Sequence, residues 1–347
     1  MNPRDSLRPE SGPFARVLEH VAQDWELDAD SPRLLRDGHN HVYEARTPGG
    51  EPLIVKVTDG ALREAVDLES ELFWLAGLAE RGCAVPTPVP ARDGRSFASY
   101  QDGERTFHAA LFQRLEGNTL DRPDPAIWDN PVFQREFGRL LGQLHRATDE
   151  IDFPPRLVRK QWYQDVEMMV PPTMPPVYDA GVISQMHAHQ QKMRALADQA
   201  TPPAYGLSHC DLIGPNVLRD GDRLWMLDFE MGCQHWRVIE LAVLVLFFHV
   251  LLVWKLPDSS PETVHTLLQN LLAGYRQEHA LDAAQLEMLP DTIGLRESFV
   301  YMVARPTPEK WDAAIENRNC TWRETVTDIE ERWRNGRPSY DLDLHGL

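Results

Sequence analysis

The sequence predicts an α+β fold with two lobes, a small β-rich lobe followed by a larger helical lobe. Two observations support this prediction. From Leu34 to about residue 114, strand-like segments and turns surround one helical segment, whereas after Gly117 the composition becomes mostly helical. We therefore expect one domain over residues 1–114 and a second over residues 115–347, with a single crossing near Leu115.

The first lobe is expected to contain two helices and several strands. Residues 13–23 have the spacing of a short amphipathic helix. The β-rich runs 41–46 and 51–57 flank the turn TPGG and predict a hairpin. Apolar residues at helical spacing predict a helix over residues 61–81, and FHAALFQRL, residues 107–115, is the clearest further strand.

The second lobe is expected to be helical around a few short strands. Helices are predicted over residues 133–147 and 182–200, with a proline-rich insertion, residues 154–176, between them. LSHCDL and RLWMLDF have strand character. Residues 238–254 are almost wholly apolar, but they are fewer than the ~20 that a spanning helix needs and include Glu240. We expect a helix buried in a large soluble domain.

Composition narrows the possible functions. The 347 residues suffice to bury a core, and the net charge of −18 argues against a nucleic-acid binder, which needs a basic face. The four cysteines are scattered without a CxxC pair, so neither a disulfide framework nor a thiolate zinc site is expected. The polar N-terminus has no signal-peptide core, which indicates a cytoplasmic protein with no membrane association.

One segment, LSHCDLIGPNVL, has the residues needed for phosphoryl transfer. It contains His209, Asp211 and Asn216 in the order His-x-Asp-x₄-Asn, and Asp228 follows twelve residues after Asn216 in the apolar run LWMLDFE. Transfer to an alcohol needs one Asp that accepts or orients the hydroxyl proton, and an Asp and an Asn that hold Mg²⁺ against the phosphates. The alternative is a polar turn capped by Asp and Asn, with an unrelated Asp beyond it.

Lys56 is the candidate phosphate ligand of the first lobe. It lies mid-strand in LIVKV, where a charge is costly unless it has a partner. Glu71 follows fifteen residues later on the next predicted helix, and Glu64 and Glu69 on that helix are alternative partners. The alternative for Lys56 itself is a strand lysine that faces solvent.

These motifs resemble those of the aminoglycoside phosphotransferase and choline kinase group, which includes homoserine kinase-like and bacterial stress-response kinase-like proteins. HCDLIGPN is similar to the group's catalytic loop and LDFE to its metal-binding strand. The resemblance implies a protein-kinase-like fold and transfer of the γ-phosphoryl group of ATP to a hydroxyl with Mg²⁺. It implies that Asp211 is the catalytic base, that His209 props the loop, and that Asn216 and Asp228 bind the metal.

The resemblance also implies a nucleotide site in the first lobe. Lys56 would clamp the α- and β-phosphates with Glu71 as its partner, and the loop around Gly38 would cover the phosphates although it lacks a GxGxxG pattern. Gln113 and Leu115, in FQRLEG, correspond to the hinge that meets the adenine. Residues 115–347 would then form the catalytic and substrate-binding lobe.

The sequence departs from the group's pattern at several positions. Cys210 stands where glycine is usual, Ile213 where histidine is common, and Glu240 in place of an aspartate after the metal strand. The order Gly214-Pro215 is also reversed. None of these changes removes a group needed for ATP or Mg²⁺, but they leave the acceptor open. Glu230 is an occasional supporting residue in such enzymes.

Three functions remain from the sequence. The first is a small-molecule kinase whose acceptor is an alcohol, with an amine-bearing alcohol as one option. The second is a Ser/Thr protein kinase of the stress-response type, although no APE-type element follows Asp228. The third is an inactive kinase-like binding protein, which the presence of the complete set of motif residues disfavours.

The amine option comes from the acidic net charge and from the C-terminal run WRETVTDIEERW. In this part of the chain, tryptophans (Trp311, Trp322 and Trp333) are interleaved with acidic residues. The alternative is a helix with packed tryptophans and solvated acids.

We predict phosphoryl transfer without an activating phosphorylation. Only nine residues separate Asp228 from Val238, and none is Ser, Thr or Tyr. Protein kinases order a longer segment there through a phosphate. Protein verified by mass spectrometry as unmodified should turn over in an ADP-release assay, and activity that depends strictly on a phosphosite would contradict this.

Overall fold

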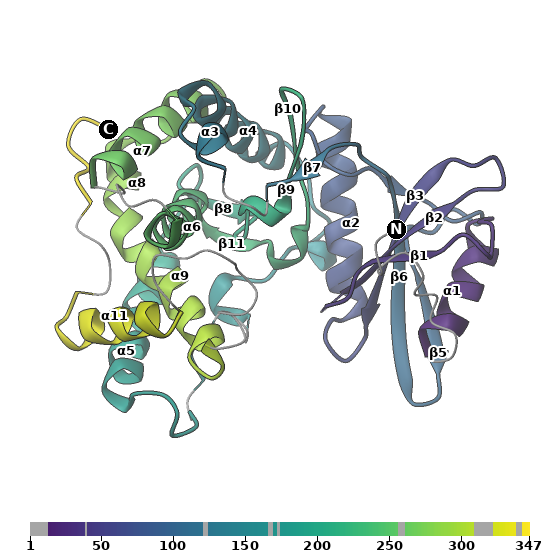
Figure 1. Cartoon of the computed structure of the whole chain (residues 1–347), viewed down its shortest axis with the longest axis horizontal. Coiled ribbons are helices and arrows are strands. Elements are labelled where there is room, and N and C mark those ends of the chain that lie inside the picture. Colours follow the sequence, from purple (N-terminus) through teal and green to yellow (C-terminus); the bar gives the residue numbers. More distant parts are fainter. Residues whose placement is uncertain are drawn as a thin grey trace. The chain divides into compact units, whose positions relative to one another are not determined.

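The computed structural model describes residues 13–38, 40–120, 124–165, 169–171, 174–255, 261–308, 322–337 and 342–347. Its contacts divide the chain into two compact units. Unit 1 comprises residues 1–118, 151–158 and 219–230, and unit 2 comprises 119–150, 159–218 and 231–347. Unit 1 contains the larger sheet and unit 2 most of the helices, so the predicted α+β class is confirmed (Figure 1).

The sheet of unit 1 is antiparallel and has the strand order β1-β2-β3-β6-β4, with β5 also paired to β6. Its strands are β1 (Arg33–Arg36), β2 (Asn40–Arg46), β3 (Pro52–Asp59), β4 (Pro88–Val89), β5 (Ala98–Asp102) and β6 (Arg105–Gln113). The predicted hairpin is β2–β3, with Val42 opposite Lys56. On the other side of β3, Lys56 pairs with Ala110. Lys56 therefore lies on a strand with a neighbour on each side.

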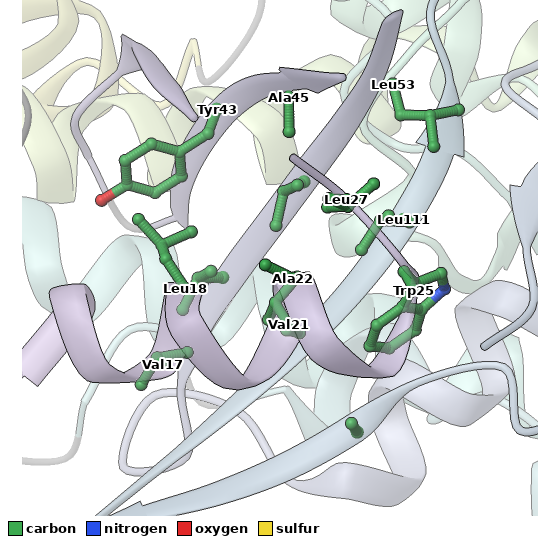
Figure 2. Close-up of a cluster of buried hydrophobic side chains, with 14 of the residues drawn as sticks. Val17, Leu18, Val21, Ala22, Trp25, Leu27, Tyr43, Ala45, Leu53 and Leu111 are labelled. Carbon is green, nitrogen blue, oxygen red and sulfur yellow. The ribbon is translucent and has the colours of Figure 1, made fainter. Parts of the chain in front are cut away.

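Helix α1 (Pro13–Asp24) forms the core of unit 1 with this sheet. Figure 2 shows apolar side chains of α1, among them Leu18 and Val21, beside Tyr43, Leu53 and Leu111 of the strands. Trp25 follows the helix, and its indole nitrogen donates to Val89 O at 2.8 Å. A helix of twelve residues is marginal in isolation. Helix α1 is therefore stabilised mainly by burial of its apolar face against the sheet.

Helix α2 (Ala65–Glu80) begins later than predicted. Residues 60–63 form a turn instead, in which the Asp59 carboxylate accepts from Ala61 N at 2.9 Å and Asp59 O accepts from Arg63 N at 3.2 Å. The short helix η1 (Pro155–Leu157) belongs to the same unit and contacts α2, where Ser70 Oγ donates to Leu157 O at 2.7 Å. Burial of Leu68, Leu72 and their neighbours fixes the orientation of α2.

Unit 2 is built on the helix pair α4 (Pro131–Asp149) and α7 (Pro261–Tyr275). Asn130 caps α4 through its side-chain oxygen, which accepts from Val132 N at 2.9 Å, and proline occupies the first turn. A Cβ at Gly138 would lie 1.9 Å from Leu271 O, so the close approach of the two helices requires glycine there. The predicted helix over residues 133–147 is confirmed.

The other described helices of unit 2 are α3 (Pro125–Trp128), η2 (Trp162–Gln164), α5 (Ala180–Ala197), η3 (Gly214–Asn216), α6 (Ile239–Lys255), α8 (Ala283–Glu287), α9 (Leu289–Ala304) and α11 (Trp322–Arg334). β8 (Tyr205–Ser208) pairs antiparallel with β11 (Cys233–Trp236), with Ser208 opposite Cys233. The chain also forms a sheet of order β10-β9-β7, from β7 (Asn118–Thr119), β9 (Val217–Asp220) and β10 (Arg223–Met226). The strand that was predicted for LSHCDL, residues 207–212, therefore ends at Ser208.

Helix α6 contains most of the apolar stretch 238–254, and the side chains from Ile239 to Leu246 are buried. The prediction of a buried helix is confirmed for these residues, while the side chains of residues 248–255 lie outside the described part. In the described residues, none of the helices is both long and apolar enough to cross a membrane.

We predict that Leu18→Ala lowers the free energy of unfolding by about 2–4 kcal/mol, because it removes a side chain that is 6% exposed and leaves a cavity between α1 and the sheet. Val132→Ala, at a position that is 60% exposed, should change it by less than about 0.5 kcal/mol. Urea unfolding measures both. Equal effects of the two substitutions would contradict the packing of α1.

Candidate active site

Lys56 lies at the centre of a cluster of charges in unit 1. Its side chain is buried, and its ammonium nitrogen has three carboxylate neighbours. These are Glu71 Oε1 at 3.4 Å, Asp228 Oδ1 at 3.4 Å and Glu230 Oε2 at 3.3 Å. Burial by itself lowers the pKa of Lys56, but the three carboxylates outweigh it and raise that pKa above its ordinary value. Lys56 therefore remains charged inside the unit, so it does not face solvent as the alternative supposed.

The structure places Glu71, rather than Glu64 or Glu69, against Lys56. Glu64 precedes the first turn of α2, and Glu69 accepts from Arg156 at 2.5 Å. The second carboxylate oxygen of Glu71 accepts from the buried guanidinium of Arg63. The charge of Glu71 is thus shared between two cations.

Asp228 is positioned by its neighbours in the chain. Its φ of 61° is in the left-handed region, which is uncommon for a residue with a side chain. Phe229, the next residue, is fully buried and packs edge-on against Trp74 of α2 at 4.9 Å between ring centroids. Helix α2 therefore supplies the carboxylate of Glu71 and, one turn later, the ring that holds the segment of Asp228.

Glu230 is held by a chain of hydrogen bonds that begins on the sheet. Thr58 Oγ1 donates to Asn40 Oδ1 at 2.5 Å, and Asn40 Nδ2 donates to Glu230 Oε2. Because the same carboxylate oxygen lies beside Lys56, Glu230 connects the start of β2 to the lysine. Glu230 is thus part of the cluster itself.

The other residues predicted to contact the nucleotide have less distinctive surroundings. Gly38 lies in the bend between β1 and β2, where an added Cβ would meet nothing closer than 3.9 Å. Gln113 ends β6, and its backbone N–H donates to Thr87 O at 3.0 Å. Leu115 follows in irregular chain and is half-buried. Their contacts with adenine and phosphate stay predictions.

In unit 2, the catalytic-loop segment follows β8 and is held by a buried carboxylate. Glu240, in the first turn of α6, accepts from the backbone N–H of His209 at 2.6 Å and of Cys210 at 3.2 Å. Cys210 has a φ of 67°, so the chain turns sharply just before Asp211. Burial raises the pKa of Glu240, while His209 and the two N–H donors act in the opposite direction.

Asp211 and Asn216 are hydrogen-bonded to each other. Asn216 Nδ2 donates to both the backbone O and the Oδ2 of Asp211, each at 2.9 Å. The backbone N–H of Asp211 in turn donates to the Nδ1 of His209, which is buried, at 3.3 Å. His209 thus contacts the backbone of the loop at Asp211, and its role as a prop stays what the resemblance implies.

Gly214 allows the loop to pass close to the chain at Leu120. A Cβ at position 214 would lie 2.1 Å from Leu120 O and 2.8 Å from the ring of Phe247. Leu120 N donates to Gly214 O and to Val217 O, both at 3.0 Å. Because a Cβ does not fit at position 214, this packing accepts glycine there and not proline, in agreement with the order Gly214-Pro215.

Arg296 was not found from the sequence. It lies on α9, and its guanidinium donates to Asp211 Oδ1 and, at 3.4 Å, to Cys210 O. The only signal in the sequence is that Arg296 is the single basic residue between Leu289 and Ala304. Asn40 and Arg63 were missed as well, because neither belongs to a local pattern.

The residues present fit a divalent metal and a polyphosphate. Asn216 uses its amide nitrogen for Asp211, which leaves its oxygen as a ligand, and Asp228 carries a partly exposed carboxylate. Both are hard oxygen donors of the kind that Mg²⁺ prefers. Around Lys56, three carboxylates face the cations Lys56 and Arg63, and Arg36 lies 3.9 Å from the second carboxylate oxygen of Asp228.

Among the described C-terminal residues, Trp322 and Trp333 do not form an exposed aromatic surface. Trp322 and Trp333 are buried in a core that α11 shares with α5 and α9. Trp333 Nε1 donates to Glu297 Oε2 at 2.8 Å, and Glu297 also pairs with Arg332. The packed-helix alternative is confirmed for these two residues, and Trp311 lies outside the described part.

Comparison with known proteins identifies the family of the chain. A family model described as the phosphotransferase enzyme family matches residues 32–286. The chain is 27% identical to amicoumacin kinase of Bacillus subtilis (strain 168) over 289 residues, which cover 82% of this chain and 83% of the relative. It is 29% identical to homoserine kinase of Cupriavidus pinatubonensis over 261 residues, which cover 66% and 73%.

Among solved structures, the chain is similar to amicoumacin kinase hAmiN in complex with AMP-PNP, Ca²⁺ and Ami. The TM-score is 0.81 at 21% sequence identity, and the match covers 96% of this chain and 97% of the other. The likeness shows the kinase-like fold.

We predict that Gly214→Ala lowers kcat/KM by about 10²-fold or more, because the added methyl group must displace the loop that carries Asn216. Gly49→Ala, where the new Cβ would come no closer than 3.7 Å to its nearest neighbour, is the matched control and should leave activity unchanged. ADP-release kinetics on both variants, with melting curves to verify folding, provide the test. A fully active Gly214→Ala enzyme would show that the loop tolerates displacement.

Proposed function

Because this chain belongs to the phosphotransferase enzyme family, we propose that residues 1–114 form the lobe that binds the nucleotide and that residues 115–347 form the catalytic and acceptor-binding lobe. The protein is an ATP-dependent kinase that uses a divalent metal ion and phosphorylates a hydroxyl group of a small molecule. What remains to be assigned is which residue performs each task.

The observation that carries our assignment on the nucleotide side is the buried cluster around Lys56. A lysine kept charged by three carboxylates is rigid and ready to meet phosphate oxygens, and Glu71 fixes its position from α2. Asp228 and Glu230 lie beside the same ammonium group. We assign Lys56 to the α- and β-phosphates, and Gly38, Gln113 and Leu115 to the phosphate loop and the adenine edge.

On the acceptor side, we assign Asp211 as the base that orients the hydroxyl and takes its proton. Asn216 fixes one carboxylate oxygen, and His209 fixes the backbone N–H. Asn216 and Asp228 are the proposed metal ligands. Mg²⁺ bound with ATP would neutralise phosphate charge as the bond to the γ-phosphoryl group breaks. The residues themselves mainly position the reactants.

For the acceptor, we propose a small alcohol that bears an amino group. Two relatives that cover about two thirds or more of the chain are named for small molecules, amicoumacin and homoserine, and homoserine is an amino alcohol. The net charge of −18 supports the same choice, although the packed C-terminal tryptophans no longer do. It also supports the further proposal that the enzyme binds no nucleic acid. We propose in addition that the enzyme acts in the cytoplasm.

We predict that Asp211→Asn lowers kcat by about 10²–10⁴-fold while ATP binding survives, because a positioned base is lost and the nucleotide side is intact. Asp228→Ala should instead change the Mg²⁺ titration or abolish activity. Titrations of ATP and Mg²⁺ with ADP-release kinetics separate the two effects, and Asp222→Asn at an exposed turn serves as the control. Near wild-type kcat in Asp211→Asn on the true acceptor would refute the assignment.

A further inference from the structure

Two buried cysteines of unit 2 are in contact beside the proposed base. The Sγ of Cys210 lies 3.5 Å from the Sγ of Cys233, and either thiol can donate a hydrogen bond to the other. Both residues are buried, and both are free thiols in the structure. Cys210 directly precedes Asp211, and Cys233 begins β11. The proposed phosphoryl transfer uses neither thiol.

Backbone pairing keeps Cys233 beside Cys210. β11 pairs antiparallel with β8, with Cys233 opposite Ser208, two residues before Cys210. The other side of β11 is held as well, because Gln234 N donates to Lys160 O at 2.9 Å. The Sγ of Cys210 also lies 3.5 Å from Ser208 O. Cys233 is therefore fixed from two sides, and the two sulfurs are held in one small region.

The backbone of Cys210 has an unusual conformation for a residue with a side chain. Its φ of 67° lies in the left-handed region, which glycine adopts freely and other residues adopt only at a cost in free energy. A glycine at this position would avoid that cost. The chain instead has a side chain here, and its thiol contacts a second thiol. The strained backbone and the thiol contact thus occur at the same residue.

A disulfide between these cysteines would displace the catalytic-loop segment. An S–S bond is about 2.05 Å long, so the two sulfurs would have to approach by about 1.5 Å. Because Cys233 is fixed from two sides, most of this movement would fall on Cys210. The carboxylate of Glu240 accepts from the backbone N–H groups of His209 and Cys210, and the movement would strain both hydrogen bonds. Asp211, the next residue, would move with them.

We propose that Cys210 and Cys233 are a site of reversible oxidation, at which hydrogen peroxide converts the two thiols to a disulfide and thereby inactivates the enzyme. One cysteine, as its thiolate, attacks the O–O bond and becomes a sulfenic acid, and the first water leaves. The sulfur of the second cysteine then attacks the sulfenic sulfur, the S–S bond forms, and the hydroxyl leaves as the second water. Two thiols are oxidised and one peroxide is reduced.

This inference goes beyond the proposed function, because it does not depend on the identity of the acceptor. A dithiol such as dithiothreitol reverses the reaction by thiol–disulfide exchange. Reduction restores the two thiols and allows the segment of Asp211 to return to its place.

Burial determines which oxidant reacts and how fast. It raises the pKa of the Cys210 thiol, so its thiolate is scarce at neutral pH and attack by this sulfur is slow. Cys210 lines a cavity of about 20 Å³, which has room for about one water molecule. A small neutral oxidant is therefore favoured over a bulky one such as glutathione disulfide. We expect the pair to stay reduced in air and to respond to sustained peroxide.

Peptide mapping locates the disulfide directly. Trypsin cleaves after Arg219 and Arg223, so it separates Cys210, in residues 195–219, from Cys233, in residues 224–237. After treatment with peroxide and alkylation, these two peptides should be found joined, and dithiothreitol should separate them. If no joined pair formed at any peroxide concentration, or if Cys83 or Cys320 took the place of one partner, the proposal would be overturned.

Matched variants test the effect on activity, with ATP, Mg²⁺ and 3-aminopropan-1-ol as the substrates of an ADP-release assay. Oxidised wild-type enzyme should lose about 10²-fold in kcat, because a displacement of about 1 Å at a catalytic group has this effect, and should recover with dithiothreitol. Reduced Cys233→Ala should match the wild type and keep its activity in peroxide. Cys210→Gly should likewise keep its own untreated activity. Cys83→Ala, the control, should be inactivated as the wild type is.

Hydrogen exchange provides a measurement that does not need turnover. The N–H groups of His209 and Cys210 should lose protection when wild-type enzyme is oxidised, and should keep it in Cys233→Ala treated in the same way. If 3-aminopropan-1-ol were not phosphorylated, the proposed acceptor would be in error, while mapping and exchange would still decide the disulfide. A joined pair of peptides with unchanged exchange and unchanged kcat would refute the inactivation.

Discussion

The burial of one positive charge determines the arrangement of unit 1. Lys56 lies in the interior of the sheet, where an unpaired ammonium group would be strongly destabilising. Its partners come from two distant parts of the chain, Glu71 on α2 and the segment of Asp228 and Glu230 after β10. The sheet, the helix and that segment must therefore come together for the charge to be tolerated. The same requirement brings together the residues that we propose for the nucleotide and the metal ion.

Unit 2 also contains a buried charged group, in this case a carboxylate. Glu240 is buried at the start of an apolar helix, and it is satisfied by two backbone N–H groups of the catalytic-loop segment. From the sequence, Glu240 stands in place of the aspartate that follows the metal-binding strand in the group that the chain resembles. The structure shows that the longer side chain holds the loop just before Asp211. Together with Gly214, it fixes the two ends of the segment that carries the proposed base.

Much of this could be predicted from the sequence because the signals are local. The spacing of His209, Asp211 and Asn216 lies within eight residues, and the helices and the hairpin follow from periodicity and turn residues. Arg296 could not be predicted, because it reaches Asp211 across 85 positions and no short pattern records such a contact. Asn40 meets Glu230 across 190 positions for the same reason. The start of α2 was misplaced because the side chain of Asp59 stabilises a turn that apolar spacing does not reveal.

The ion pair between Glu297 and Arg332 connects helix α11 to the surroundings of Arg296. Glu297 follows Arg296 directly on α9, and its charge is balanced from α11 by Arg332 and the indole of Trp333. A substitution on α11 would shift this balance next to Arg296 without altering any residue of the motif. Substitutions in the C-terminal helix can therefore alter the surroundings of Arg296, and through it those of Asp211, while every residue of the catalytic-loop segment stays the same.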